Sequence, residues 1–294
     1  MFLGSSGLGG TDFWSLQGWI LKLGKYSTRL RTSVETFVDC LSNGSLLWTS
    51  YCAFMFGLLI AIDKQPGVLP VGVGEIWWYL FANIFLRSRD QKQTWRFRMD
   101  ICVLDSRREL TARSTGFKIY WMKNRLRRNM FFFLKNAKNT FNEINQVGMI
   151  WTVWHLWPSG ARFFFNWHLH WLLIVLRNEN GLAGTLHSRE GMTQGDPLEM
   201  ITYRIWILPL INNLKWEIHD ITQLWYADDA GALGTFKILE TYSDLLTRQG
   251  SGRGYHPNPT KTVLLVRPEN IKAVKVFGAC HGFRGCRGAR YLGG

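Results

Sequence analysis

Two adjacent aspartates between two short apolar runs restrict the fold of this 294-residue sequence more than any other feature. Residues 221–225 and 230–233 have strand-like content, and residues 226–229 (Tyr-Ala-Asp-Asp) stand between them, which predicts a β-hairpin with two carboxylates at its turn. Like charges a few ångströms apart repel each other unless a cation neutralises them. The pair therefore indicates either a divalent-metal site or an ordinary exposed turn, where Asp is common.

The segments on either side of the hairpin also have readable patterns. Residues 130–134 are an apolar run of strand length that ends in Lys135-Asn136, and a helix is expected after them. This helix is expected to carry three residues on one side: Phe141, Ile144 and Gly148. Another helix is predicted to end at Gly250, and residues 262–266 supply a further strand.

The clearest helix start lies at residues 196–199. Asp196 is a good N-cap, Pro197 suits the first helical position, and Glu199 is placed to close a capping box. Five apolar residues then repeat at helical spacing: Leu198, Ile201, Ile205, Leu208 and Ile211. The order strand, helix, helix, hairpin, helix and strand predicts an α+β fold with helices on one face of the sheet.

The charge of the chain favours a polyanionic partner. Its 35 Lys and Arg residues against 21 Asp and Glu give a formal net charge of +14. Nucleic acid is the first candidate partner and an anionic membrane surface is the second. Arginines are concentrated between residues 87 and 128, where they indicate either a solvated face or a surface that neutralises template phosphates.

The cysteines and the N-terminus indicate an intracellular protein, nuclear or cytoplasmic, rather than a secreted one. The five cysteines have no regular spacing, which argues against a disulfide framework and for a reducing compartment. Cys280, His281 and Cys286 lack the paired spacing of zinc sites. Residues 1–4 (Met-Phe-Leu-Gly) place no basic region before the apolar residues, as a secretory signal requires.

One uncharged stretch raises the question of membrane insertion. No charged side chain occurs between Cys40 and Ile62, and residues 46–62 approach the length of a transmembrane helix. Ser, Asn, Gly and Thr residues at 42–45, 49 and 50 interrupt this stretch, and the purely apolar part that remains has a length that also occurs in buried helices. A buried helix and a membrane span are both open on this pattern alone. The motifs described next favour the buried helix and no stable membrane association.

The hairpin and a second motif resemble reverse transcriptases of the non-LTR retroelement type. Residues 226–229 are similar to the catalytic box of that family. Residues 190–198 (Glu-Gly-Met-Thr-Gln-Gly-Asp-Pro-Leu) resemble its Gln-Gly-x-Pro motif, whose loop and helix contact the incoming nucleotide and the template. The resemblance implies a nucleotide-binding role for Gln194, Gly195 and Pro197. The order and distance of the two motifs carry the resemblance.

Further segments extend the resemblance over nearly the whole chain. Residues 136–143 resemble the first palm motif, in which an aromatic residue blocks a nucleotide 2′-hydroxyl, and Phe141 occupies that position. Residues 254–262 resemble a segment whose lysine, here Lys261, assists the leaving pyrophosphate. Residues 63–71 resemble a fingers loop that holds the triphosphate, which implies a nucleotide contact for Lys64. Residues 288–294 resemble the primer-grip turn.

The resemblance implies an RNA-directed DNA polymerase with a right-hand core. A fingers-like region would cover residues 1–128, and a palm with the catalytic hairpin and the primer-grip turn would cover residues 129–294. The palm sheet would be antiparallel with helices on one face, and the thumb incomplete or absent. Asp228 and Asp229 would hold Mg²⁺ or Mn²⁺ at a two-metal site that adds deoxynucleotides from their triphosphates to a DNA primer on an RNA template.

Two departures from the family pattern predict an impaired, degenerate copy. Asn136 stands where the first motif has its metal-bridging Asp, and Leu69 stands where the fingers loop has an Arg. Drift away from Arg would also explain the 15 tryptophans. Two alternatives stay open: a non-catalytic nucleic-acid-binding remnant, and a membrane protein with a span at 46–62.

The first palm motif also makes a geometric prediction. If residues 130–134 form the strand beside the hairpin, an Asn136 oxygen should lie within roughly 7 Å of an Asp228 carboxylate oxygen, because two catalytic metals about 3.5–4 Å apart share ligands. Phe141 and Gln194 should line the same cleft. A chance Asn in an unrelated loop predicts no such meeting.

Overall fold

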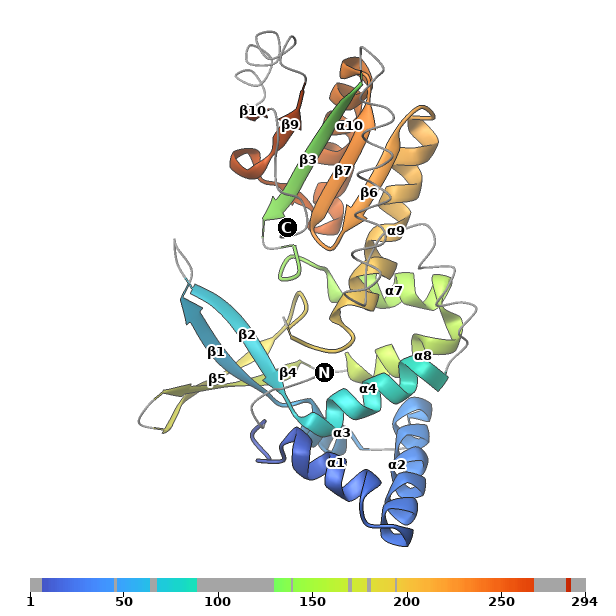
Figure 1. Cartoon of the computed structure of the whole chain (residues 1–294), viewed down its shortest axis with the longest axis vertical. Coiled ribbons are helices and arrows are strands. Elements are labelled where there is room, and N and C mark those ends of the chain that lie inside the picture. The colour runs from blue at the N-terminus through green and yellow to red at the C-terminus, as the bar shows by residue number, and fades with distance from the viewer. Residues whose placement is uncertain are drawn as a thin grey trace. The chain divides into compact units, whose positions relative to one another are not determined.

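The computed structural model of the chain describes residues 7–44, 47–63, 68–88, 130–138, 140–168, 171–178, 181–193, 195–266 and 284–286. They form a mixed α+β structure with two compact units (Figure 1). The first unit draws on residues 1–94 and 144–202, and the second on residues 95–143 and 203–294. Both units thus draw on both sides of residue 128, and the fingers-like and palm regions remain predictions.

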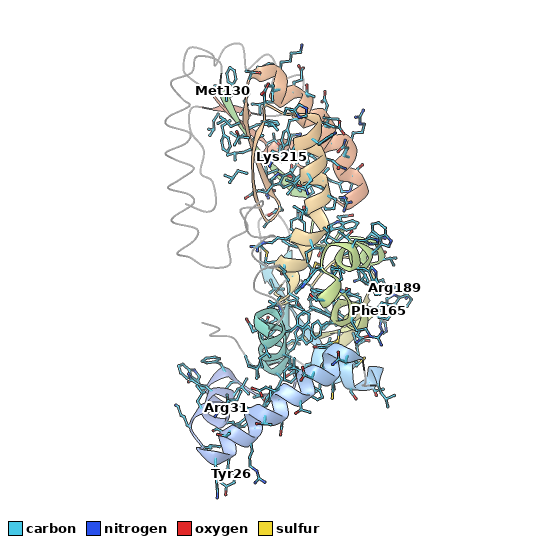
Figure 2. All side chains as sticks on the ribbon, turned by 90° about the vertical axis from the view of Figure 1, so that its right-hand side faces the viewer. Tyr26, Arg31, Met130, Phe165, Arg189 and Lys215 are labelled. Atoms are coloured by element: carbon cyan, nitrogen blue, oxygen red, sulfur yellow. The ribbon has the colours of Figure 1, made fainter. Side chains whose placement is uncertain are left out.

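The first unit combines helices with a four-stranded sheet. Its helices are α1 (Phe13–Leu21), α2 (Lys25–Asn43), α3 (Trp48–Met55), α4 (Ile76–Ser88), α7 (Gln146–Leu156) and α8 (Pro158–Trp167). Its strands are β1 (Gly57–Asp63), β2 (Val68–Gly74), β4 (Leu172–Asn178) and β5 (Gly181–Ser188), in the order β2-β1-β4-β5. Arg31 of α2, labelled in Figure 2, donates from Nη1 to the carbonyl oxygen of Ile20 at 2.7 Å and so connects the first two helices.

The uncharged stretch 46–62 is not one helix, which corrects both interpretations offered for it. Helix α3 ends at Met55, Phe56 has φ −56° and ψ 130°, and β1 begins at Gly57. Strand β1 pairs antiparallel with β2 and parallel with β4, so its apolar side chains belong to a sheet. Among the described residues, no helix has the length and apolar character that a membrane crossing requires.

Aromatic side chains fill the core of the first unit. The Phe85 ring stacks on Phe163 with centroids 4.0 Å apart, and Trp78 meets Trp167 edge to face at 4.4 Å. Both tryptophans are 3% exposed, whereas Trp171 is 52% exposed. Part of the tryptophan excess therefore has a packing role, because these large rings are buried where α4 meets α8.

The second unit is built on a mainly antiparallel sheet with helices on one side (Figures 1 and 2). Its strands lie in the order β10-β9-β3-β7-β6, and β8 pairs with β3. They are β3 (Phe131–Lys138), β6 (Thr222–Tyr226), β7 (Asp229–Gly234), β8 (His256–Pro257), β9 (Val263–Leu265) and β10 (Arg284–Cys286). Helix α10 (Phe236–Gly250) belongs to this unit, as do the residues of α9 (Glu199–Glu217) from Tyr203 onward.

Strand β3 has two different faces because successive side chains of a strand point to opposite sides. Phe132 and Leu134 pack with Leu233 of β7 in one apolar cluster. Phe131, on the other face, meets Phe236 of α10 with ring centroids 6.0 Å apart. Both faces are buried, which explains why residues 131–134 are apolar without alternation.

The boundaries of β3 and α7 differ from those that the sequence predicts. Strand β3 continues past Leu134 to Lys138, because its last residues pair with β7 and then with β8. Helix α7 begins only at Gln146, after Asn145, whose side chain accepts a hydrogen bond from Gly148 N at 2.7 Å. Phe141 and Ile144 therefore precede the helix instead of lying on one side of it.

Gly254 should be indispensable to the second unit. Its φ is +68°, and a side-chain carbon there would overlap the carbonyl oxygen of Glu143. Gly254→Ala should lower the free energy of unfolding by about 2 kcal/mol or more, from backbone strain and overpacking together. Urea unfolding of the purified protein measures this.

Gly252 is the matched control for that substitution. It lies two positions away, has no positive φ, and has open space where a Cβ would lie. Gly252→Ala should change stability by less than about 1 kcal/mol. Equal losses in the two variants would contradict the packing of Gly254 against Glu143.

Candidate functional site

The hairpin that carries the two aspartates turns within two residues. Tyr226 at the end of β6 pairs with Asp229 at the start of β7, so Ala227 and Asp228 form the turn. Ala227 has φ +47°, and no other residue except glycine has a positive φ in the described part of the chain. A positive φ at the first turn position is typical of the hairpin turns whose twist matches that of the strands. The tight turn projects both carboxylates at one end of the sheet.

Strand β3 brings Asn136 to this turn. The β3–β7 register pairs Asn136 with Asp229, although 93 positions separate them in the chain. The Asn136 amide Nδ2 donates to Asp228 Oδ2 at 2.9 Å and to Asp229 Oδ1 at 2.7 Å. The expected meeting of Asn136 with Asp228 therefore occurs, at direct hydrogen-bond distance.

The electrostatics of Asp229 follow from its partial burial. Loss of solvent raises the pKa of Asp229 above its ordinary value, and the nearby Asp228 charge acts in the same direction. The hydrogen bond from Asn136 and the charge of Lys261 oppose this rise in pKa. Ionised Asp229 thus costs free energy in the folded protein, and donors or cations at this position reduce that cost.

Backbone hydrogen bonds hold the turn against β3. Ala137 N donates to the Asp228 carbonyl oxygen at 3.2 Å. The hydroxyl of fully buried Tyr255 lies 3.2 Å from the same oxygen and 3.3 Å from that of Lys135. Asn258 N donates to the Asn136 carbonyl oxygen at 2.7 Å. The segment 254–258 therefore fixes both the strand and the turn.

Phe141 lies on an aromatic side chain that the sequence did not single out. Its ring centroid is 4.9 Å from that of Tyr203, which is fully buried in α9. Burial raises the pKa of Tyr203 well above its usual range, and the charges of Asp228 and Asp229 add to this effect. Tyr203 is thus close to the carboxylates, and nothing in the α9 pattern distinguishes it from other core positions.

The remaining predicted residues are placed less directly. Lys261 is exposed in the short 3₁₀ helix 259–261, and its charge acts on Asp229. Gln194 and Lys64 lie outside the described residues, as do 288–294. The common cleft expected for Phe141 and Gln194 therefore stays a prediction. Of Leu69, the structure describes only its backbone pairing with Ile62.

Gly195 and Asp196 are held within the first unit. Gly195 has φ +100°, and a side-chain carbon there would lie 2.5 Å from the carbonyl oxygen of Gly72. Its N–H donates to Glu199 Oε2 at 3.0 Å, and the Tyr79 hydroxyl donates to its carbonyl oxygen. Asp196 Oδ1 accepts from Leu198 N at 2.8 Å. Helix α9 begins at Glu199, three residues after Asp196, and the two carboxylates accept from Leu198 N and Gly195 N instead of forming the capping box that the sequence predicts.

Loss of solvent also affects the two carboxyl groups at this helix start. It raises the pKa of Asp196 to about 8, although hydrogen bonds from Leu198 N and from Trp78 Nε1 at 3.0 Å oppose the rise. It raises the pKa of Glu199 to about 7. Both groups therefore titrate near neutral pH, where Asp196 is largely protonated.

A two-metal centre needs oxygen ligands with more negative charge than this site offers. No group of three or more His, Cys, Asp or Glu side chains suited to a metal ion occurs among the described residues. The Asn136 N–H groups point at the carboxylate oxygens that a cation would take, and Asn136 Oδ1 is buried without a hydrogen-bond partner. The residues as arranged do not fit a two-metal centre.

Comparison of the sequence with protein-family models and with curated proteins gives no match. The solved structures that resemble the chain include apo telomerase from Candida tropicalis, with a TM-score of 0.58 and 15% identity over 74% of this chain and 45% of that one. Telomerase from Candida albicans in complex with the TWJ fragment of telomeric RNA gives a TM-score of 0.53 and 11% identity over 72% and 42%.

Apo telomerase from Candida tropicalis, truncated from its C-terminal domain, gives a TM-score of 0.56 and 15% identity over 72% of this chain and 50% of that one. The fold is similar to that of telomerase. At these identities the likeness concerns the fold alone. This chain spans half or less of the length of each of these telomerases.

Ala227 should be a strained position at the hairpin turn. Glycine adopts a positive φ without the steric cost that alanine meets, so Ala227→Gly should raise the free energy of unfolding by about 1 kcal/mol. Ala232→Gly is the control, because Ala232 is fully buried in β7 and pairs with Phe133. It should lower stability by about 1 kcal/mol. Urea unfolding measures both variants. If the two substitutions change the free energy of unfolding in the same direction, Ala227 is not strained.

Proposed function

We propose that this chain is a reverse-transcriptase-like polymerase domain of the non-LTR type that binds an RNA template and a DNA primer but is impaired in nucleotidyl transfer. One observation carries the proposal: the Asn136 amide is hydrogen-bonded to both Asp228 and Asp229 across neighbouring strands. A catalytic carboxylate at position 136 would instead share a metal with the pair.

Fold and charge support the nucleic-acid part of the proposal. Telomerases are among the structural neighbours, and two of these structures are complexes with a fragment of telomeric RNA. The net charge of +14 supplies the electrostatic attraction that sequence-independent binding needs. Phosphate contacts act through Lys and Arg and require no metal, so this property is independent of the carboxylate pair.

The proposed active site assigns a role to each remaining residue. Asp228 and Asp229 are the residues that would hold Mg²⁺ or Mn²⁺ if a third acidic ligand were present, and such ions would supply the Lewis-acid chemistry of nucleotidyl transfer. Phe141 would select deoxynucleotides, and its contact with Tyr203 would keep the ring in place. Lys261 would assist the leaving pyrophosphate.

A second segment would complete the nucleotide site. Gln194, Gly195 and Pro197 would position the base pair, and Lys64 would contact the triphosphate. The positive φ of Gly195 supports this role, because only glycine lets the backbone approach Gly72 so closely at that turn.

The alternative function is a nucleic-acid-binding module without chemistry. It is favoured by the position of the Asn136 amide, whose two hydrogen bonds satisfy the Asp228 and Asp229 carboxylates without any cation. The two functions share the fold and the charge. Primer extension on an RNA template, with magnesium and with manganese, separates them. The third possibility, a membrane span at 46–62, loses its basis in the division of that stretch between α3 and β1.

Asn136→Asp should give Asp228 and Asp229 a third acidic neighbour and make the stability of the site depend on a metal ion. Without divalent ions, the variant loses two hydrogen bonds and gains a like charge, so it should be less stable than the wild type by about 2 kcal/mol or more. Added Mn²⁺ should restore its stability by mass action, whereas the wild-type protein should respond little. Thermal melting with and without Mn²⁺ measures this, and primer extension shows whether activity returns with the metal.

Asn136→Ala is the control for that experiment. It removes the same two hydrogen bonds without adding a charge, so it should lose stability and gain no response to Mn²⁺. Strong magnesium-dependent extension by the wild-type protein, abolished by Asp228→Asn, would show that Asn136 is tolerated and would overturn the proposed impairment.

Binding to a primer–template duplex should depend steeply on salt and weakly on sequence. For a protein that contacts about six to ten phosphates, raising the salt concentration from about 50 to 200 mM lowers the affinity roughly a thousandfold or more. Fluorescence anisotropy with a labelled RNA–DNA duplex measures the slope. A variant with both Asp228 and Asp229 changed to Asn should bind at least as tightly, because it loses only negative charge. Affinity that does not change with salt would contradict phosphate-based binding.

A further inference from the structure

Lys135 is a buried cation on the face of β3 opposite Asn136. The two residues are consecutive, so their side chains leave the strand in opposite directions. Asn136 reaches the carboxylate pair, whereas Lys135 reaches Ser243 of α10. Lys135 is 6% exposed, which is unusual for a lysine, and the opposite charge that acts on it is that of Asp244, which is exposed on α10.

The contacts of Lys135 in the described part of the chain are all with neutral groups. Nζ donates to Ser243 Oγ at 2.8 Å and more weakly to the Ser243 carbonyl oxygen at 3.4 Å. The Phe133 ring lies 5.3 Å from Nζ, at cation–π distance. A buried ammonium group needs an opposite charge to offset the loss of its hydration. These contacts supply none, and the Asp244 charge that acts on Lys135 belongs to an exposed side chain.

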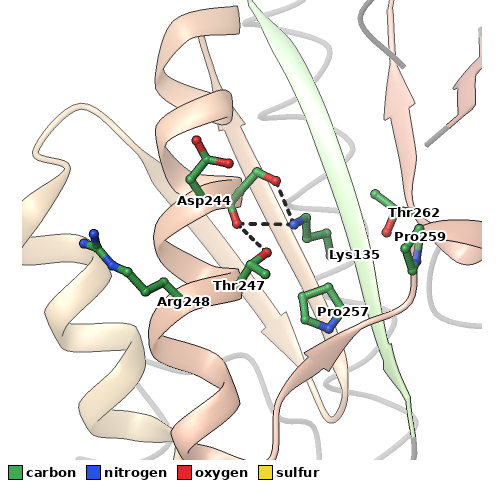
Figure 3. Close-up of a pocket in the computed structure, with 8 residues that line it drawn as sticks. Lys135, Asp244, Thr247, Arg248, Pro257, Pro259 and Thr262 are labelled. Atoms are coloured by element: carbon green, nitrogen blue, oxygen red, sulfur yellow. Dashed lines mark hydrogen bonds between the residues drawn. The ribbon is translucent and has the colours of Figure 1, made fainter. Parts of the chain in front are cut away.

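A hollow of about 420 Å³ adjoins this side chain (Figure 3). Its lining residues come from β3, α10 and the segment 257–262: Lys135, Ser243, Asp244, Thr247, Arg248, Pro257, Pro259 and Thr262. Sites for small molecules commonly span roughly 300–1,000 Å³. The hollow is therefore large enough for a ligand and has a cation in its wall.

The polar groups of the hollow favour an anion. The Thr247 and Thr262 hydroxyls donate to backbone carbonyl oxygens, both at 2.8 Å, so their hydrogens are already in use. The donors left for a ligand are the remaining N–H of Lys135, the Ser243 hydroxyl and the exposed Arg248 guanidinium. Asp244 is the one carboxylate in the lining, and it is exposed on α10, so the charged side chains sum to +1.

We propose that this hollow binds a phosphate group, with Lys135 Nζ as its central donor. Lysine binds phosphate as a point charge, and the Ser243 hydroxyl adds a hydrogen bond from the same side. Pro257 and Pro259 form an apolar wall for the organic part that follows the phosphate. The ligand is therefore a phosphate ester, either a free nucleotide or one phosphate of a nucleic-acid backbone. The site is separate from the carboxylate pair and does not depend on polymerase activity.

Thermal melting at constant ionic strength, with chloride as the reference anion, tests the site. Inorganic phosphate and adenosine monophosphate should raise the melting temperature, whereas adenosine should not. Lys135→Met keeps the length of the side chain without its charge and should weaken phosphate binding roughly tenfold or more. Lys237→Gln removes the same charge from the exposed part of α10 and should leave binding unchanged. No shift in the wild-type protein, or equal shifts in Lys135→Met, would overturn the proposal.

Ser243→Asp provides a test that does not remove the buried lysine. The Ser243 hydroxyl is 2.8 Å from Nζ, so a carboxylate at this position should pair with Lys135 and take the place of the ligand. The variant should melt higher than the wild type and should lose the response to phosphate. Retention of the full phosphate response would refute the assignment of the site to Lys135.

The same variant distinguishes the two sources of phosphate. If Ser243→Asp lowers affinity for single-stranded RNA together with the response to adenosine monophosphate, the natural ligand is a backbone phosphate. If only the nucleotide response is lost, the ligand is a free nucleotide. Both results support the site, and neither depends on whether Asn136→Asp restores a metal.

Discussion

The antiparallel register between β3 and β7 is the constraint on which the rest of the second unit depends. It places Asn136 opposite Asp229 and at the same time directs Lys135 toward α10. A slip of one residue would exchange these side chains between the two faces. The apolar residues 131–134 do not prevent that slip, because both faces of the strand are buried there and an apolar side chain suits either face. The polar residues that follow them set the register instead.

The Asn136 amide performs structurally what a metal ion performs in a two-metal polymerase site. Both relieve the repulsion between adjacent carboxylates, but the amide does so with two neutral N–H donors. The hydrogen bonds stabilise the fold while they occupy the oxygens that chemistry would need. This is a local form of the general trade between stability and activity, because an active site keeps charges together at a cost in folding free energy.

Local chemistry in the sequence predicted the elements whose ends carry strong signals. The hairpin at 222–234, the turn at Asp196 that leads into α9 and the end of α10 at Gly250 all follow from turn and capping residues. The division of 46–62 into α3 and β1 could not be predicted, because an apolar run gives no periodicity that distinguishes a buried helix from a buried strand. Periodicity also gave no sign that Asn136 lies inside a strand; its pairing with the hairpin came from the family resemblance.

Tyr255 connects the two sites that lie on opposite faces of β3. Its hydroxyl lies within hydrogen-bond distance of the backbone oxygens of both Asp228 and Lys135, at 3.2 and 3.3 Å. One donor hydrogen is thus shared between the hairpin turn and the strand that carries the buried cation. The carboxylate pair and the Lys135 hollow are therefore chemically separate sites, and Tyr255 joins the hairpin turn to the strand that carries both Asn136 and Lys135.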